Sequence, residues 1–368
     1  MSKRFFLPLL LLSAVALSGC ATERFTITGG WAGPVATEEL VYIGSRDGRM
    51  LALDVNTGDL KWSFPRREED PLGGIYGTPF LTEDSVYVGT FEGKLYALSS
   101  ADLSRRWEFP VGDRQAGHII GGPTVADGQV IFGTSDGSIR SLDVFSGLPK
   151  WVFQVDNQVW STPTVVDGTA YVTSLDHHVY ALSLRDGIQK WLVPFEAGGA
   201  IVSSPLVIEG TLYVGSFDST FYALDTTDGS EEWRFNGEGW FWSNPVANDR
   251  LVFAGTTSGK LYALDRTTGF LIWEYDLESP IISTPALIDG RLVVTSDDGV
   301  IQMLGADDGT LLGSFPSIKT QVRAPLGSRG NTMYVNEMDG KVWALEMDSR
   351  GRGFDRFWPE PFDTRSGN

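Results

Sequence analysis

The fourteen-residue stretch KLYALDRTTGFLIW (residues 260–273) decides the fold, because close copies of it recur along the chain. RMLALDVNTGDLKW occupies residues 49–62, KLYALSSADLSRRW residues 94–107, and TFYALDTTDGSEEW residues 220–233. Self-similarity at a regular spacing is the signature of a repeat architecture. We therefore interpret the chain as a series of similar units.

The repeating unit opens with a proline, and a short apolar segment of the VYVG type follows it after seven or eight residues. These segments begin at residues 41, 86, 130, 170, 212, 252, 292 and 333, so the period is 40–45 residues. Eight units fill the chain from about residue 30 to its C-terminal region and leave no room for a second domain.

Each unit contains four short segments with the character of β-strands. In the seventh unit they are STPALIDG (283–290), RLVVTS (291–296), VIQML (300–304) and DGTLLGSF (308–315). Asp-Gly pairs between alternating segments favour tight turns with positive φ. Four strands in about 40 residues are typical of a propeller blade. The sequence predicts an all-β, eight-bladed β-propeller of four-stranded antiparallel blades over residues 30–358, followed by a flexible tail, 359–368.

The motif ALDxxTGxxxW resembles the tryptophan-docking motif of quinoprotein-type propellers, also called PQQ-like repeat propellers. That family includes quinoprotein alcohol dehydrogenases and BamB-type assembly lipoproteins. The resemblance implies that each tryptophan stacks on a neighbouring blade, on the peptide beside the glycine. A flat indole buries a large apolar area, so repeated stacking helps to close a ring. The expected docking residues are Trp62, Trp107, Trp151, Trp191, Trp233 and Trp273.

Three units depart from this motif. The second keeps Trp107 but lacks the glycine, and the seventh and eighth have Gly313 and Phe354 where tryptophan is expected. We expect these last two blades to dock more loosely. For ring closure, we favour Phe25–Ile27 as the outer strand of the last blade over the competing segment Phe354–Trp358.

The N-terminus has the layout of a secretory signal, with Lys3 and Arg4 before a short apolar run. LSGC, ending at Cys20, resembles a bacterial lipobox, which implies cleavage before the cysteine and acylation (palmitate) of its thiol. We expect residues 1–19 to be a lipoprotein signal peptide and residues 20–29 to be a lipidated tether; a plain signal peptide is the alternative. The protein would then be exported and lipid-anchored, on the periplasmic side of the outer membrane in a double-membrane bacterium and on the cell surface otherwise.

The net charge of the chain is −18, and it becomes −20 without Lys3 and Arg4 (27 basic against 47 acidic residues). No basic block is present, which argues against nucleic acid as a partner. Membrane attachment is expected through the lipid alone. Cys20 is the single cysteine, so no internal disulfide is possible.

Two sets of residues are expected on the face where the central channel opens. The residues three before each proline place four aromatic side chains at equivalent positions, and His118 and Arg323 lie near the same loops. The candidate channel-face binding residues are Trp31, Tyr76, His118, Trp160, Trp242 and Arg323. Alternatively, these aromatics plug the channel or pack between blades. The other positions of the first set are Ile120, Val202, Ile282 and Val322.

The second set is acidic and lies in the turn between the second and third strands of the blades. It gives the channel face a negative ring suited to a basic partner or a loosely held cation, but turn formation alone also explains it. The acids are Asp47, Glu92, Asp136, Asp176, Asp218, Asp297, Asp298 and Asp339. His177 and His178 are adjacent in one such turn, where two side chains diverge, so we expect no shared metal ion.

The chain lacks the motifs HExxH, GxSxG and Walker A, and no nucleophile is paired with a base. The resemblance implies that a quinoprotein dehydrogenase uses PQQ and calcium beneath an adjacent Cys–Cys disulfide, which one cysteine cannot form. We therefore expect no cofactor, no metal and no catalytic residue. The favoured hypothesis is a non-enzymatic, monomeric, membrane-anchored scaffold that binds envelope proteins, including a β-barrel assembly component. The alternatives are a PQQ-like ligand-binding or sensing propeller and, less favoured, a quinoprotein dehydrogenase.

Overall fold

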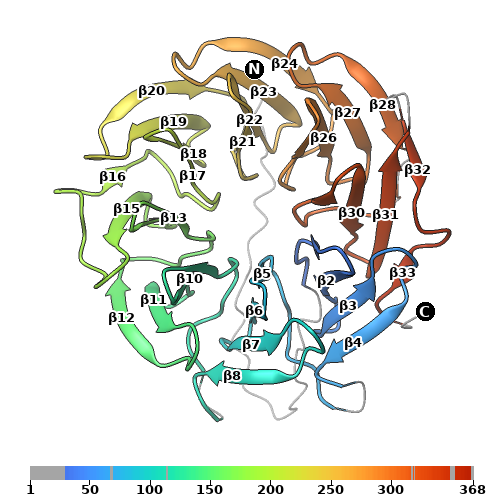
Figure 1. Cartoon of the computed structure of the whole chain (residues 1–368). Coiled ribbons are helices and arrows are strands. Elements are labelled where there is room, and N and C mark those ends of the chain that lie inside the picture. The colour runs from blue at the N-terminus through green and yellow to red at the C-terminus, as the bar shows by residue number, and fades with distance from the viewer. Residues whose placement is uncertain are drawn as a thin grey trace, which may run out of the picture.

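The computed structural model describes residues 30–66, 69–112, 115–315, 318, 320–348 and 353–365. These residues form eight antiparallel sheets arranged in a ring, and none of them is helical (Figure 1). The prediction of an eight-bladed β-propeller is confirmed. Cys20 and Phe25–Ile27 lie outside the described residues.

The strands of the first four blades follow one another from the channel outward. Blade 1 contains β1 (Val35–Ala36), β2 (Leu40–Gly44), β3 (Met50–Asp54) and β4 (Leu60–Phe64). Blade 2 contains β5 (Phe80–Leu81), β6 (Ser85–Gly89), β7 (Leu95–Ser99) and β8 (Arg105–Phe109). Blade 3 contains β9 (Thr124–Ala126), β10 (Gln129–Gly133), β11 (Ser138–Asp143) and β12 (Pro149–Gln154). Blade 4 contains β13 (Thr164–Val166), β14 (Thr169–Thr173), β15 (His178–Ser183) and β16 (Phe195–Glu196).

The other four blades repeat this order, and the last gains a fifth strand. Blade 5 contains β17 (Leu206–Ile208), β18 (Thr211–Gly215), β19 (Thr220–Asp225) and β20 (Glu231–Asn236). Blade 6 contains β21 (Val246–Ala247), β22 (Leu251–Gly255), β23 (Lys260–Asp265) and β24 (Leu271–Asp276). Blade 7 contains β25 (Ala286–Ile288), β26 (Arg291–Thr295), β27 (Ile301–Gly305) and β28 (Leu311–Phe315). Blade 8 contains β29 (Gly327–Arg329), β30 (Thr332–Asn336), β31 (Lys341–Met347), β32 (Phe354–Arg356) and β33 (Phe362–Asp363).

The core consists of layers between neighbouring blades. Successive side chains of a strand point to opposite sheet faces. On β2, Val41 and Ile43 pack against blade 8, whereas Tyr42 packs against blade 2. Both faces of the middle strands are therefore covered, which explains why they are apolar almost throughout.

The docking tryptophans join successive blades. The Trp233 indole lies on Gly269 of the next blade and donates its N–H to the carbonyl of Arg266 at 2.9 Å. Gly269 has φ of 71°, and a Cβ there would lie 2.6 Å from the indole, so only glycine fits. The same contact joins Trp107 to Gly147, Trp151 to Gly187, Trp191 to Gly229 and Trp273 to Gly309.

Trp62 departs from the expectation because the next blade has no glycine to receive it. Leu103 occupies that position with φ of 56° and is fully buried. The Trp62 side chain stays 46% exposed. The hydroxyl of Tyr42 still donates to the carbonyl of Ser100 across this junction, at 2.5 Å.

The eighth blade also differs from the sequence-based expectation. β31 pairs with β32 and β33, so the C-terminal segment, and not the favoured candidate Phe25–Ile27, supplies the outer edge next to β31. Trp358, and not Phe354, docks this blade. Its indole lies on Gly58 and donates its N–H to the Val55 carbonyl at 3.0 Å. The segment expected to be a flexible tail thus contributes β33 to the last sheet.

Candidate functional site

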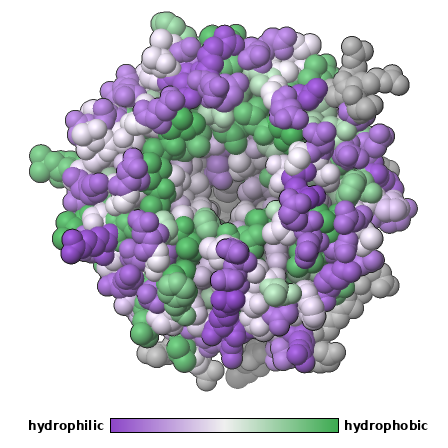
Figure 2. Space-filling model, viewed as in Figure 1, coloured by the Kyte–Doolittle hydropathy of each residue, from purple (hydrophilic) through white to green (hydrophobic). Residues whose placement is uncertain are grey.

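The central channel contains a cavity of about 760 Å³, formed by the loops that lead from the outer strand of one blade to the inner strand of the next. The ring is hollowed at its centre, with hydrophobic residues around the hollow and hydrophilic residues farther out (Figure 2). All eight blades contribute to the wall, so the repeat places equivalent residues around one space.

Buried residues fix which side chains reach this space. In the loop before blade 6, Phe241 is buried against Gly215, and the next residue, Trp242, lines the cavity. Val159 packs in the same way on Gly133 and directs Trp160 to the channel. A glycine is required at these strand ends, since a Cβ at Gly133 would lie 2.1 Å from Val159.

The expected channel positions line the cavity in seven of the eight blades. They are Trp31, Tyr76, Ile120, Trp160, Val202, Trp242 and Ile282. In blade 8 the expectation for Val322 is wrong: Val322 is fully buried, and Arg323 faces the cavity instead. Arg323 is two residues before Pro325, whereas the residue that lines the cavity in the other loops is three residues before the proline. This loop is therefore one residue shorter at that point.

The aromatic residues form two clusters. On one side, the rings of Trp31 and Tyr76 meet edge to face at 4.5 Å, and Phe91 follows Tyr76 at 5.4 Å. On the blade 5–6 side, Phe217 stacks on the indole of Trp240 at 4.8 Å and on that of Trp242 at 5.2 Å. Phe91 and Phe217 each directly precede the acidic residue of a hairpin turn, and this position in the repeat is the sequence signal for them.

His118 lies behind the first cluster. Its ring stacks on that of Phe91, with 4.0 Å between centroids and an interplanar angle of 4°. Its Nδ1 is within hydrogen-bonding distance of the Phe91 carbonyl. Because Phe91 faces the cavity and His118 does not line it, His118 supports the wall and does not form it.

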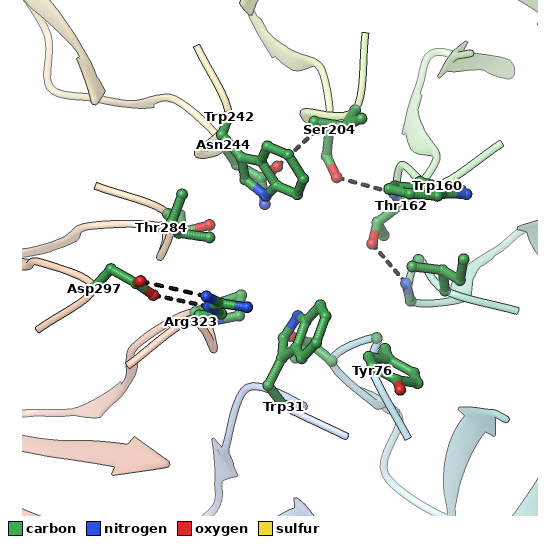
Figure 3. Close-up of a pocket in the computed structure, with 18 of the residues that line it drawn as sticks. Trp31, Tyr76, Trp160, Thr162, Ser204, Trp242, Asn244, Thr284, Asp297 and Arg323 are labelled. Atoms are coloured by element: carbon green, nitrogen blue, oxygen red, sulfur yellow. Dashed lines mark hydrogen bonds and ion pairs between the residues drawn. The ribbon is translucent and has the colours of Figure 1, made fainter. Parts of the chain in front are cut away.

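A belt of polar residues, each directly before a proline, lies next to the aromatics (Figure 3). This polar belt consists of Thr78, Thr162, Ser204, Asn244 and Thr284. The backbone N–H of Gly122 donates to the Thr162 hydroxyl at 2.8 Å, and that of Thr162 donates to the Ser204 hydroxyl at 2.9 Å. The Ser204 N–H in turn donates to the Asn244 side-chain oxygen at 2.7 Å. The sequence showed these residues as repeat markers, but only the structure reveals that they link neighbouring blades.

One ion pair lies at the cavity wall. The Nε and Nη2 atoms of Arg323 contact the two carboxylate oxygens of Asp297 at 2.8 and 3.3 Å (Figure 3). The Gln321 amide also donates to Asp297, at 3.0 Å. Such a two-point contact fixes the guanidinium plane.

Other acids of the second set hold their own turns. Asp136, Asp176 and Asp218 each accept a backbone N–H from two residues onward, at 2.8–3.0 Å. Partial burial works against ionisation of Asp136, but hydrogen bonds from Thr134 and Ser138 outweigh it and lower the pKa of Asp136. Within the described ranges, no group of three or more His, Cys, Asp or Glu side chains is arranged to hold a metal ion, His177 and His178 included.

No helix that is long and apolar enough to cross a membrane occurs in the part of the chain that the structure describes.

Comparison with known proteins gives a family match over most of the chain. The family model described as "Outer membrane protein assembly factor BamB" matches residues 15–119, 68–159, 116–194, 163–240 and 237–352. A search of curated proteins by sequence found no match.

Three solved structures show similar folds. BamB from Moraxella catarrhalis is 21% identical with a TM-score of 0.72, over 86% of this chain and 94% of that one. The computationally designed Ika8 protein is 16% identical with a TM-score of 0.76, over 87% and 96%. Quinohemoprotein alcohol dehydrogenase from Comamonas testosteroni is 17% identical with a TM-score of 0.69, over 87% and 71%. At these identities, the likeness concerns the fold.

Proposed function

Because this chain belongs to the family of PQQ-like repeat propellers described as outer membrane protein assembly factor BamB, we propose that it is a protein-binding scaffold of the bacterial envelope. Its role would be to hold a β-barrel assembly component during outer-membrane protein assembly. The observation that supports this most is the family match, which runs from residue 15 to residue 352 and so covers seven blades and the inner three strands of the eighth.

The channel face is the surface that we assign to the partner. Loops from all eight blades converge there, and loops on a rigid scaffold commonly carry binding residues. Glu92 in a hairpin turn and Glu238 in the loop before blade 6 are both exposed on it. With a net charge of −18, the chain attracts a basic surface at long range.

The location follows from the same proposal. Acylation of Cys20 would attach the ring to the outer membrane by a short tether, with the propeller in the periplasm. Lipid chains stabilise such attachment by about 0.8 kcal/mol for each buried methylene. The acidic propeller would then stand away from an anionic membrane surface, with its loops free for a protein partner.

The non-enzymatic part of the proposal is tested separately, because the fold is shared with a quinohemoprotein alcohol dehydrogenase. The purified full chain is mixed with pyrroloquinoline quinone and Ca²⁺, and dye-coupled oxidation of alcohols is followed. We expect no turnover above that of the quinone alone. Turnover that depends on the protein and saturates with quinone would overturn this part.

The scaffold role is tested by direct binding. The full chain and the purified central component of the β-barrel assembly machinery from the same organism are measured by biolayer interferometry at low and high salt. We expect binding that weakens with salt and that the double substitution Glu92→Lys, Glu238→Lys weakens about tenfold.

Asp228→Lys is the matched control for this experiment. Asp228 is exposed in the turn before β20, on the opposite face of the ring, so this change makes the same kind of charge reversal away from the proposed surface. The control should bind like the unmodified chain. No binding by the unmodified chain contradicts the scaffold role, and equal loss in both variants contradicts the assignment to the channel face.

A further inference from the structure

The cavity has the size and wall of a small-molecule site. Its volume of about 760 Å³ lies within the range of roughly 300–1,000 Å³ that is typical of ligand pockets. Trp31, Trp160 and Trp242 come from three different blades, are partly exposed, and surround the open centre (Figure 3). The wall thus offers large flat apolar surfaces at several places around one space.

The polar groups of the wall retain unused hydrogen-bond donors. Within the described residues, the hydroxyls of Thr162 and Ser204 accept backbone N–H groups but donate to no protein acceptor. The same holds for the side-chain NH₂ of Asn244, whose oxygen accepts from Ser204. The Trp160 indole N–H is already bound to Gln158 at 2.9 Å, whereas that of Trp242 has no acceptor among these residues. A ligand here meets donors beside apolar faces.

These features exclude several ligand classes. A wholly apolar ligand would displace water from the polar belt and leave each donor unpaired, at about 1–3 kcal/mol each. An anion would find one guanidinium, that of Arg323, which Asp297 already neutralises. A cation would compete with Arg323 for Asp297 and could not accept hydrogen bonds from the donors of the polar belt.

We propose that the cavity binds a neutral oligosaccharide, with sugar rings stacked on the indoles of Trp160 and Trp242 and hydroxyl groups bound to the polar belt. Sugars of the β-gluco configuration carry their hydroxyls at the ring edge, so both ring faces expose C–H groups. Such a ring places its apolar faces against the indoles, while hydroxyl oxygens at its edge accept hydrogen bonds from the Ser204 hydroxyl and the Asn244 side-chain NH₂. This site uses other side chains than the proposed partner surface, although the loop before blade 6 contributes to both. Trp160 and Trp242 line the cavity, whereas Glu92 and Glu238 are exposed.

The test uses the full chain in a detergent without a sugar headgroup, with cellotriose and the trisaccharide of N-acetylglucosamine as probes. Saturation-transfer-difference NMR and tryptophan fluorescence report the binding. We expect saturation transfer to the ring C–H protons and a saturable change in fluorescence. Trp160→Ala and Trp242→Ala should each weaken binding about tenfold, and Asn244→Ala should weaken it as well.

Trp62→Ala is the matched control, because Trp62 is an exposed indole outside the cavity. It should leave the affinity unchanged. Trp160→Leu, which keeps an apolar side chain in the loop but removes the flat ring, replaces Trp160→Ala if that variant does not fold. The proposal is overturned if neither trisaccharide shows saturation transfer, or if the cavity variants bind as well as Trp62→Ala. Saturable binding of pyrroloquinoline quinone without any response to the sugars would overturn it in favour of a planar aromatic ligand.

Discussion

Trp358 lies across Gly58, and its indole N–H donates to the carbonyl of Val55, so the last blade docks on the first across 300 residues of sequence. The indole is fully buried and belongs to the core cluster shared by blades 1 and 8, next to Val41 and Tyr334. The contact that joins other neighbours in the ring therefore also closes it.

Removal of this closing contact should strongly destabilise the protein. For Trp358→Ala we expect the free energy of unfolding to fall by about 3–5 kcal/mol, because a large buried ring is lost and a cavity remains. Urea unfolding followed by circular dichroism measures the change. Trp62→Ala, at an exposed indole, should cost under about 1 kcal/mol. Equal losses in the two variants would show that docking does not close the ring.

The docking glycines should tolerate no side chain for two reasons: their φ is positive, and an indole of the neighbouring blade lies on them. A matched pair of glycines separates these two effects. Gly269 and Gly128 have nearly the same φ, 71° and 72°, but a Cβ at Gly269 meets Trp233 at 2.6 Å, whereas one at Gly128 meets nothing within 4 Å. Gly128→Ala should cost about 1–2 kcal/mol from backbone strain alone. Gly269→Ala should cost a further 1–3 kcal/mol or so, because the indole must shift. Thermal unfolding of both variants compares them, and equal midpoints would contradict the packing argument.

Glu337 makes stability depend on pH. It stands where the other seven blades have serine or threonine, and only 2% of its surface is exposed. Burial first, and Asp339 second, raise the pKa of Glu337 to about 7 from 4.5, against hydrogen bonds from Thr320 and Trp343. Between these two values the folded chain holds a proton that the unfolded chain has released.

This difference sets the direction of the effect. The stabilisation from protonated Glu337 is complete below pH 4.5 and is lost as the pH rises to about 7. Glu337→Gln keeps a neutral side chain of the same shape and should remove this dependence. Between pH 4.5 and about 7, the free energy of unfolding of the variant should fall by a few kcal/mol less than that of the unmodified protein. Urea unfolding at several pH values measures both proteins, and parallel pH profiles would contradict the assignment.

Asp297 and Arg323 should be coupled, though modestly, since both are partly exposed. We expect Asp297→Asn and Arg323→Ala each to lower the free energy of unfolding by about 1 kcal/mol, and the double variant to lose less than the sum. Chemical denaturation of the four proteins gives the coupling energy. A coupling that vanishes at low salt would show that the pair adds no stability.

Local patterns were sufficient to predict the blades and most of the channel wall. Strand alternation, Asp-Gly turns and the spacing of Trp233 from Asp225 depend on residues close together in sequence, and these predicted the fold correctly. The position of Trp242 three residues before a proline also placed it in the cavity wall. The prediction failed for Val322, because one missing loop residue shifts which side chain is buried, whereas Arg323, a candidate channel-face residue, does line the cavity.

What the sequence by itself determined is the repeat: eight units of four strands, with an indole and a glycine at fixed places in most of them. Only the tertiary structure decided which tryptophans dock. Docking needs both an indole and, on the next blade, a glycine backbone with positive φ. Trp62 has the indole, but Leu103 stands where the next blade would need glycine, whereas Trp358 lies outside the expected spacing and still reaches Gly58. The physical reason is that a stacking contact needs an indole from one blade and a receiving glycine from the next, so no single repeat decides whether it forms.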